Sequence, residues 1–236
     1  MTHDTVQNVP KPSPEQLRAL VALMLSSESA RSRSVPLHHA PESLARSPAK
    51  LDVLVNALIV FINKGIAAAT VQDLLDAAGI SRRTFYKYFS NKIDVLESLY
   101  KLSIDVMVLR YQSDIAAASS IEDAARHLVD VFFAYHHDLA PVIRMMQEES
   151  VRIGSPLAPH RAEAMAIVAG LVNDQIQRIS GKRVDPLLIR TLMGAMESAS
   201  IEYLRDSSLV SKDIVHVQQV MMFVAEAALV RAVQAA

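Results

Sequence analysis

Apolar residues recur along most of the chain at the three- and four-residue spacing of an amphipathic helix. The clearest case begins at Ser47-Pro48, a helix cap followed by proline at the first helical position, and ends at Gly65. Its apolar residues follow at i, i+3, i+4, i+7, i+8 and i+11, and they are Leu51, Leu54, Val55, Leu58, Ile59 and Ile62. Similar spacing predicts further helices at 91–117, 120–137, 139–151, 157–180, 186–206 and 211–234. No alternating strand pattern of useful length appears, so the sequence predicts an all-α protein.

The first 46 residues differ in kind from the rest and are predicted to form an N-terminal arm. Six of the 10 prolines lie before residue 49. Ser13-Pro14, with Gln16 at the third helical position, predicts a short helix that continues from Leu17 to Leu25. Residues 29–48 have the Arg, Ser and Pro content of a linker. Two interpretations stay open: an accessory contact with DNA or a partner, and an appendage packed on its own body.

Residues 70–92, TVQDLLDAAGISRRTFYKYFSNK, carry the most informative pattern. Thr70 and Asp73 form a capping pair that predicts a short helix ending at Gly79, where the chain must turn at positive φ. Ser81 then caps a second helix from Arg82 to Phe89. Two short helices joined by a tight glycine turn form a helix-turn-helix, which offers its second helix to the major groove of DNA.

The charges and aromatic residues of this segment support the same prediction. No Asp or Glu occurs between Asp76 and Asp94, whereas Arg82, Arg83, Lys87 and Lys92 all fall in that window, and a phosphate backbone would meet no repulsion there. On a helical projection Arg82, Tyr86, Arg83 and Lys87 occupy an arc of roughly 140°, which leaves Phe85 to face the first helix of the unit. Asn91 with Asp94 predicts the start of the next helix, where a second phosphate could dock.

The amino-acid composition excludes several classes of protein and of functional site. There are 24 Lys and Arg residues against 25 Asp and Glu, so a uniformly basic protein that coats nucleic acid is excluded and any nucleic-acid site must be local. The absence of cysteine excludes disulfide frameworks, thiol nucleophiles and cysteine-ligated metals. The longest run without Asp, Glu, Lys or Arg is Ile214–Ala225, shorter than the roughly 20 apolar residues of a spanning helix. We therefore expect a soluble, cytoplasmic protein without membrane contact.

At the residues of the helix-turn-helix the sequence resembles the tetracycline-repressor (TetR) family of bacterial regulators. The resemblance runs from about Leu51 to Tyr100 and rests on Gly65, Thr70, Ala78-Gly79-Ile80-Ser81, Thr84-Phe85-Tyr86, Tyr88-Phe89 and Asn91-Lys92. It departs from the family at Tyr88, where a histidine is common, and in the long N-terminal arm. The resemblance implies phosphate contacts from Thr70, Thr84, Tyr86, Tyr88 and Lys92, and base-edge contacts from Gln72, Arg82, Arg83, Tyr86 and Lys87.

The DNA-contacting set is therefore expected to be Thr70, Gln72, Ser81, Arg82, Arg83, Thr84, Tyr86, Lys87, Tyr88 and Lys92. From chemistry alone, Arg82 or Arg83 is suited to pair with guanine O6 and N7, whereas Lys92, Thr84 and Tyr86 would position the helix on phosphates. The alternative is a merely solvated basic face whose aromatic residues belong to the core.

The C-terminal part is expected to be a helical bundle, which in the family holds a small-molecule pocket and pairs with a second copy. Two helices carry the candidate dimer interface, at Gly194, Ala195, Ser198, Ala199, Val217, Val220, Met221, Val224 and Ala228. The alternative is that these apolar stripes are only intramolecular core. Large adaptable side chains near the middle of the bundle are the candidate ligand contacts, and they are Met107, Tyr111, Phe132, Phe133, Tyr135, Met145 and Met146.

Other chemistry is not supported by the sequence. His136 and His137 are adjacent, not three or four residues apart as two metal ligands on one helix face would be. Glu148-Glu149 is interpreted as helix surface, with Arg144 placed to pair with Glu148. No Gly-rich phosphate loop, nucleophile elbow or metalloprotease motif occurs, so no enzyme, metal or cofactor is expected.

Together these patterns predict three segments: an arm (1–46), a helix-turn-helix DNA-binding domain (47–92) and a helical ligand-binding and dimerisation domain (93–236). The expected function is a homodimeric, ligand-responsive regulator, a repressor that binds a pseudo-palindromic operator on double-stranded DNA and responds to a small, apolar effector. The alternative is an architectural or partner-docking helix-turn-helix protein without effector control.

Overall fold

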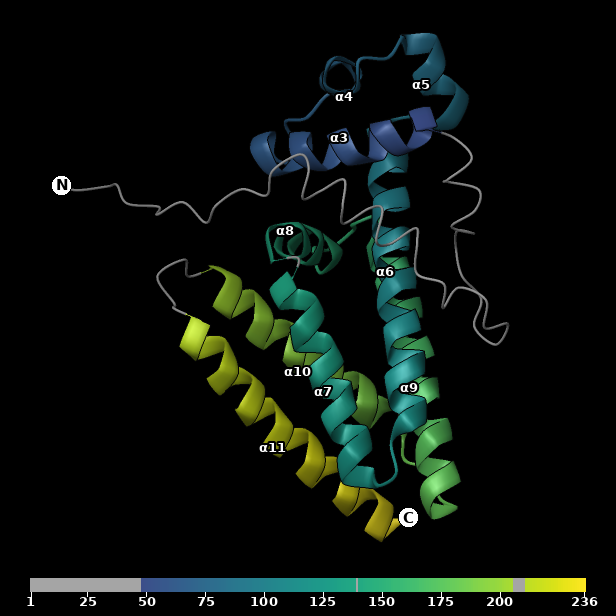
Figure 1. Cartoon of the computed structure of the whole chain (residues 1–236), viewed down its shortest axis with the longest axis vertical. Coiled ribbons are helices and arrows are strands. Elements are labelled where there is room, and N and C mark those ends of the chain that lie inside the picture. Colours follow the sequence, from purple (N-terminus) through teal and green to yellow (C-terminus); the bar gives the residue numbers. More distant parts are fainter. Residues whose placement is uncertain (1–47, 139, 206–210) are drawn as a thin grey trace, which may run out of the picture. The chain divides into compact units, whose positions relative to one another are not determined.

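The computed structural model describes residues 48–138, 140–205 and 211–236, and within these ranges it is built from α-helices without strands (Figure 1). The helices are α3 (Pro48–Lys64), α4 (Val71–Ala78), α5 (Arg82–Tyr88), α6 (Lys92–Ala117), α7 (Ile121–Asp138), α8 (Ala140–Ser150), α9 (Ala158–Ser180), α10 (Pro186–Arg205) and α11 (Ser211–Ala235). The all-α prediction is confirmed, and the helices agree with the expected ranges to within one or two residues at each end. The short helix expected at 17–25 lies outside the described residues.

Local signals in the sequence explain where the early helices end. α3 ends at Lys64 because Gly65 follows with φ 78°, a left-handed conformation that favours glycine. The amide of Gly65 donates to the carbonyl of Phe61, which closes the last turn. Six residues then connect α3 to α4, and the expected stop at Gly65 is confirmed.

The chain divides into two compact units. The first contains the described residues 48–106 and 149–160. In this unit α3 packs against both α4 and α5 (Figure 1). Leu54, Leu74 and Phe85, one from each of these helices, are fully buried. Helices of 8 and 7 residues are too short to be stable alone in water, so α4 and α5 depend on this packing.

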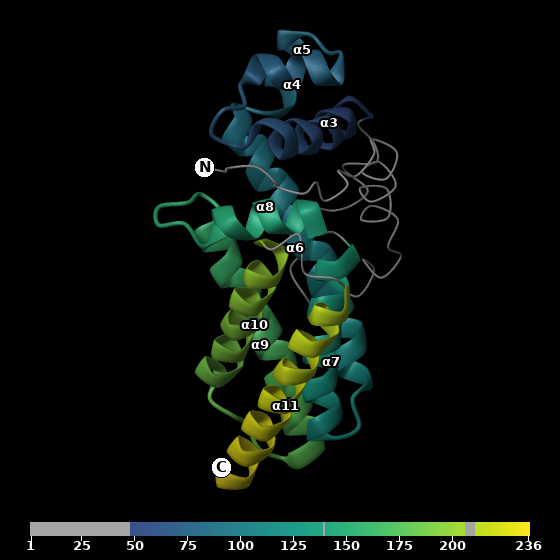
Figure 2. The same ribbon diagram turned by 90° about the vertical axis from the view of Figure 1, so that its left-hand side faces the viewer.

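The second unit contains the described residues 107–148 and 161–236. α7, α10 and α11 pack against one another, with α7 and α11 lying side by side (Figure 2). α11 buries Met221, Ala225 and Leu229, one row of residues at four-residue spacing. A hydrogen bond of 2.7 Å from Gln218 Nε2 to Asp130 Oδ1 joins α11 to α7.

The opposite face of α11 is apolar and open to solvent. Val215, Val220, Phe223 and Val224 are exposed, Phe223 to 73%. By length and composition alone the segment Ile214–Ala235 is apolar enough to cross a membrane, although Glu226 and Arg231 interrupt it, and only 22% of its most apolar window is buried. The count of uncharged residues in the sequence did not single out this helix. An exposed apolar face of this length is typical of an interaction surface.

Candidate nucleic-acid interface

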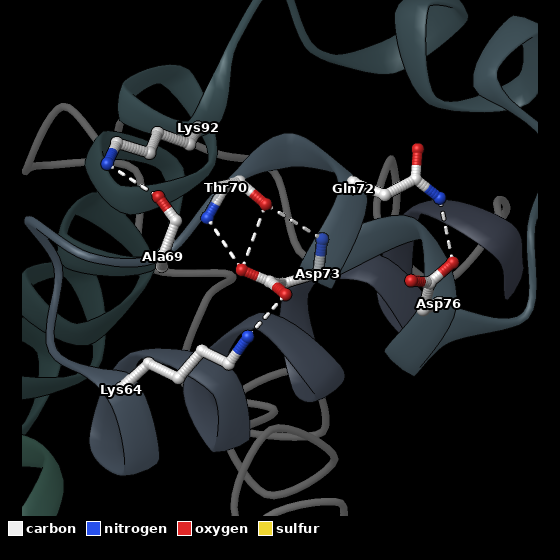
Figure 3. A network of polar contacts seen from close by, with 7 residues as sticks. All are labelled: Lys64, Ala69, Thr70, Gln72, Asp73, Asp76 and Lys92. Carbon is white, nitrogen blue, oxygen red and sulfur yellow. Dashed lines mark hydrogen bonds and ion pairs between the residues drawn. The ribbon is translucent and has the colours of Figure 1, made fainter.

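Capping interactions fix the first helix of the candidate interface. The Thr70 side chain accepts a hydrogen bond from the amide of Asp73, and the Asp73 carboxylate accepts one from the amide of Thr70 (Figure 3). At the other end Gly79 adopts φ 63°, and its amide donates to the carbonyl of Leu75. The predicted capping pair and the predicted glycine turn are both confirmed. The turn therefore has a defined geometry on both sides of residues 79–81.

Asp73 also connects α4 to α3. Its Oδ1 accepts an ion-paired hydrogen bond from Lys64 Nζ (Figure 3). The hydrogen bond from Lys64, together with those from Thr70, lowers the pKa of Asp73 to about 2. The carboxylate is therefore ionised at neutral pH, as both the cap and the ion pair require.

α5 is fixed by a cap at its start and by aromatic side chains along its inner face. Ser81 Oγ accepts a hydrogen bond of 3.1 Å from the amide of Thr84, which confirms the expected cap. Phe85 is fully buried and Phe89 almost so, and their ring centroids lie 5.7 Å apart. Tyr86 packs edge-on against Phe85, at 5.4 Å between ring centroids. The prediction that Phe85 faces the core is confirmed.

The outer face of α5 is cationic and open to solvent. Arg82, Arg83 and Lys87 are exposed, and half of the Tyr86 surface is accessible. Lys87 Nζ lies 5.3 Å from the centroid of the Tyr88 ring, a cation–π contact that keeps the ammonium at the surface. This short helix therefore presents three positive charges and an aromatic hydroxyl on its outer face, and two buried phenylalanines anchor its inner face.

A chain of polar contacts connects this face to α4. Arg82 Nη2 donates to Gln72 Oε1 at 3.1 Å, and Gln72 Nε2 donates to Asp76 Oδ1 at 2.8 Å (the second contact is drawn in Figure 3). Sequence reasoning placed Gln72 and Arg82 in one DNA-contacting set but did not identify Asp76. The four-residue spacing of Gln72 and Asp76 on one helix was the available signal.

Lys92 is engaged within the first unit. Its ammonium donates to the carbonyls of Ile66, Ala67 and Ala69 at 2.9, 2.8 and 2.6 Å (the last is drawn in Figure 3). An ammonium has three N–H donors, so a phosphate contact by Lys92 would require at least one of these bonds to open. Asn91 Oδ1 accepts from the amides of Ile93 and Asp94, which confirms the predicted start of the helix.

The remaining residues of the expected set lie around the same surface. Thr70, Gln72 and Ser81 are exposed, whereas Thr84 and Tyr88 are half-buried. All belong to α4, α5 or the caps that precede them. The helix-turn-helix thus brings every residue of the expected set into the first unit, and their contacts with DNA stay predictions.

Comparison with known proteins identifies what the helix-turn-helix segment resembles. Residues 53–99 match the model of bacterial regulatory proteins of the tetR family. The segment that contains the helix-turn-helix is therefore similar to the tetR family. It is 29% identical over 116 residues to the transcriptional repressor KstR2 of Mycolicibacterium smegmatis, covering 48% of this chain and 56% of that protein. It is 24% identical over 138 residues to the transcriptional activator FasR of the same species, covering 58% and 63%.

A solved structure shares the fold over a larger part of the chain. The transcriptional regulator FadR from Bacillus subtilis, solved in complex with stearoyl-CoA, aligns with a TM-score of 0.62 at 19% identity, over 75% of this chain and 98% of that one. The alignments with the first curated relatives span only about half of those proteins' length. The family model matches residues 53–99, whereas the structural likeness covers 75% of the chain.

The residues expected to contact a ligand lie on α6, α7 and α8 of the second unit. Tyr111, Phe132, Phe133, Tyr135 and Met146 are buried, and Met107 and Met145 are half-buried. Burial raises the pKa of Tyr111, whose hydroxyl donates to the carbonyl of Leu128 at 3.2 Å. Their role in ligand binding stays a prediction.

A partly buried ion pair in the same unit was not anticipated from the sequence. Arg161 on α9 donates from Nε and Nη2 to the carboxylate of Glu197 on α10, with Nε at 2.9 Å from Oε2. Burial raises the pKa of Glu197 against the opposing effect of Arg161. The two residues are 36 positions apart, and no local pattern signals their contact.

The residues expected at a tetR-type dimer interface divide between two faces. Val220 and Val224 are exposed, as are Ala195 and Ser198, whereas Gly194, Ala199, Val217 and Ala228 are intermediate. Met221 is buried within its own chain, because it lies on the row that packs against the neighbouring helices. Sequence reasoning missed three exposed apolar residues, namely Val215 and Phe223 on α11 and Leu187 on α10. Phe223 lies three residues after Val220, and this helical spacing was the available signal for it.

Proposed function

We propose that the chain is a ligand-responsive transcriptional repressor that binds a pseudo-palindromic operator as a homodimer and is released by a small apolar effector. The observation that carries the proposal is the exposed face of α5, where Arg82, Arg83, Tyr86 and Lys87 stand on a helix anchored by buried Phe85. We place this activity in the cytoplasm and assign no enzymatic step to the chain.

In this proposal α5 enters the major groove. Arg82 and Arg83 have the planar donor pairs that suit guanine O6 and N7, and each good bidentate pair contributes about 1–3 kcal/mol of discrimination. Thr70, Ser81, Thr84, Tyr86 and Tyr88 supply hydroxyls for phosphates, and Lys87 adds a charge. The acid-free interval from residue 77 to residue 93 removes repulsion along the segment that contains α5.

Homodimer formation is supported by the open face of α11. A single helix-turn-helix contacts few base pairs. A two-fold dimer doubles the contacted sequence, and the centres of its two half-sites lie a multiple of about 10 bp apart. Val220, Phe223 and Val224 form an apolar surface on a helix whose other side is packed, which suits a self-complementary interface. A lipid bilayer is the competing occupant, and Glu226 and Arg231 disfavour it.

The effector is proposed to bind in the second unit, among the aromatic and methionine side chains of α6, α7 and α8. Apolar side chains of this size and adaptability suit an acyl chain. A relative of the same fold was solved with stearoyl-CoA, and this supports a fatty acyl thioester as the first probe. The effector would act by favouring one spacing of the paired α5 helices over another.

The experiment is binding of the full chain to DNA selected from a randomised duplex pool. We expect a palindromic consensus, a two-to-one ratio of chain to duplex, and release by stearoyl-CoA but not by coenzyme A alone. Arg82→Ala and Arg83→Ala should relax base preference within the consensus. Equal losses on selected and random duplex for both variants would refute the assigned base-reading role.

Two further measurements separate the proposal from its alternatives. Phe223→Glu should give a monomer by light scattering that loses affinity for the palindrome, with exposed Leu187→Glu as the matched test of the α10 edge. Recovery of the wild-type chain in the membrane fraction would favour the lipid interpretation. DNA binding that no apolar ligand changes would favour an architectural protein without effector control.

A further inference from the structure

Three polar side chains form one continuous relay across the helix-turn-helix. Arg82 at the start of α5 donates to Gln72 on α4 at 3.1 Å, and Gln72 donates to Asp76 one turn further along α4 at 2.8 Å. All three side chains are exposed on the surface that carries the DNA-contacting set. The relay therefore connects an expected base reader to a carboxylate that sequence reasoning did not include.

The chemistry of the two ends permits only one orientation of the central amide. A guanidinium only donates and an ionised carboxylate only accepts, so Gln72 must turn Oε1 toward Arg82 and Nε2 toward Asp76. An amide that reads adenine needs its oxygen and its nitrogen together on the base edge. In the relay, the two ends of the Gln72 amide are instead directed to two different protein side chains.

We propose that Asp76 and Gln72 are positioning residues that hold Arg82 in its base-reading conformation. The inference rests on the proposed DNA-binding function and deepens it by assigning specificity at one base pair to Arg82 acting through this relay. Arg82 uses one of its five N–H donors on Gln72 and keeps enough for a bidentate contact with guanine. Fixing one end of a long, flexible side chain before DNA arrives reduces the entropy lost on binding.

The position of Asp76 separates this role from a structural one. Asp76 lies in the last turn of α4, which ends at Ala78, and a negative charge there interacts unfavourably with the helix dipole. A carboxylate beside a DNA surface also repels phosphate whatever the sequence. Removal of this charge is therefore expected to preserve or raise both fold stability and affinity for random DNA, while it lowers base discrimination.

The experiment compares Asp76→Ala with Asp76→Asn in the full chain, on the duplex selected by the wild type and on its single-base variants. For Asp76→Ala we expect discrimination at one symmetric base-pair position to fall by about two- to tenfold, the range that corresponds to one ordinary hydrogen bond. Affinity for random duplex should be unchanged or higher. Asp76→Asn removes the charge but keeps an acceptor for Gln72 Nε2, so it should retain most of the discrimination.

Two controls isolate the relay. Asp52→Ala removes an exposed carboxylate from α3 in the same unit and should leave discrimination unchanged. In a Gln72→Ala background, Asp76→Ala should cause no further loss, because the connection to Arg82 is already broken. The melting temperature of each variant is measured by circular dichroism. That of Asp76→Ala should stay at or above the wild-type value.

The outcomes separate this inference from the proposed function. A wild-type chain that selects no common sequence refutes the function itself. The relay alone is refuted if the wild-type chain selects a consensus and the Asp76→Ala variant discriminates between bases as well as the wild type does. The relay is also refuted if Asp76→Ala lowers specific and random binding equally, or loses discrimination by the same factor with Gln72 already removed.

Discussion

The hydrogen bonds of Lys92 provide a direct test of what stabilises the first unit. Its ammonium donates to three carbonyls in the connection between α3 and α4, at 2.6 to 2.9 Å. Lys92→Met keeps most of the aliphatic length of the side chain and removes all three donors. The carbonyls of Ile66 and Ala69, which take part in the half-buried bonds, would then lose their partner.

The expected cost follows from those two carbonyls. Ala67 is exposed, so water replaces its hydrogen bond at little cost. A hydrogen bond to a charged group contributes about 1.5–3 kcal/mol, and a buried acceptor without a partner costs about 1–3 kcal/mol. With partial access of water to both sites we expect a net loss of about 2–4 kcal/mol, which for a chain of this size corresponds to about 5–15 °C in melting temperature.

The assay combines thermal unfolding with the salt dependence of DNA binding. Lys92→Met should lower the melting temperature and leave the slope of log affinity against log salt unchanged once binding is measured well below that temperature. Lys87→Met is the matched control, because Lys87 is exposed on α5 and its Nζ lies over the Tyr88 ring. That control should lower the slope by about one and leave the melting temperature nearly unchanged.

The opposite pattern would refute the reasoning. If Lys92→Met melts with the wild type and its salt slope falls by about one, the ammonium binds phosphate and the three carbonyl contacts do not stabilise the unit. A loss in both measurements would mean that the ammonium exchanges its carbonyl partners for phosphate when DNA binds.

Three further predictions concern pH, backbone conformation and the buried ion pair. The pKa of Asp73 is lowered from 3.8 to about 2, so the ionised carboxylate contributes its full stabilisation above pH 4 and loses it as the pH falls toward 2. Asp73→Asn should remove this part of the acid-unfolding profile, measured by circular dichroism. Gly79→Ala should lower the free energy of unfolding in urea by about 1–2 kcal/mol because of the left-handed φ alone, since an added Cβ meets nothing within 4 Å. Gly79→Asn should lower it by less. Equal stability of Gly79→Ala and the wild type would contradict this prediction. Arg161→Ala should destabilise the chain by about 1.5–3 kcal/mol at neutral pH, because it leaves the partly buried carboxylate of Glu197 without its partner. The pKa of Glu197 is raised already in the wild type, so stability is lost as the pH rises through that pKa, and the Arg161→Ala defect should be smaller at pH 5 than at pH 8; a defect independent of pH would argue against an ionised Glu197.

The local geometry of the helix-turn-helix was readable from the sequence because its signals act over three or four residues. Thr70, Gly79 and Ser81 each satisfy or redirect the backbone within one turn, and each does in the structure what its type predicts. Phe85 faces the core because it lies opposite the charged arc of a helix with 3.6 residues per turn.

Contacts between distant residues were not readable in this way. Lys92 was assigned to phosphate from its charge and position, whereas the structure places its ammonium on carbonyls more than 20 residues earlier in the chain. Met221 and Phe223 belong to one apolar stretch of sequence, yet one is buried and the other is 73% exposed. Periodicity gives the spacing of a stripe but not which of two apolar faces a neighbouring helix covers.

The sequence by itself determined the helices, their ends, the glycine turn and the cationic character of α5, because hydrogen bonding and side-chain spacing within a few residues decide all of these. Only the tertiary structure decided the partners of several charged groups: Arg82 with Gln72, Lys92 with the connection before α4, and Arg161 with Glu197. The physical reason is that these partners are chosen by how helices pack. A change of one residue in the facing helix would alter the partner without altering any local pattern.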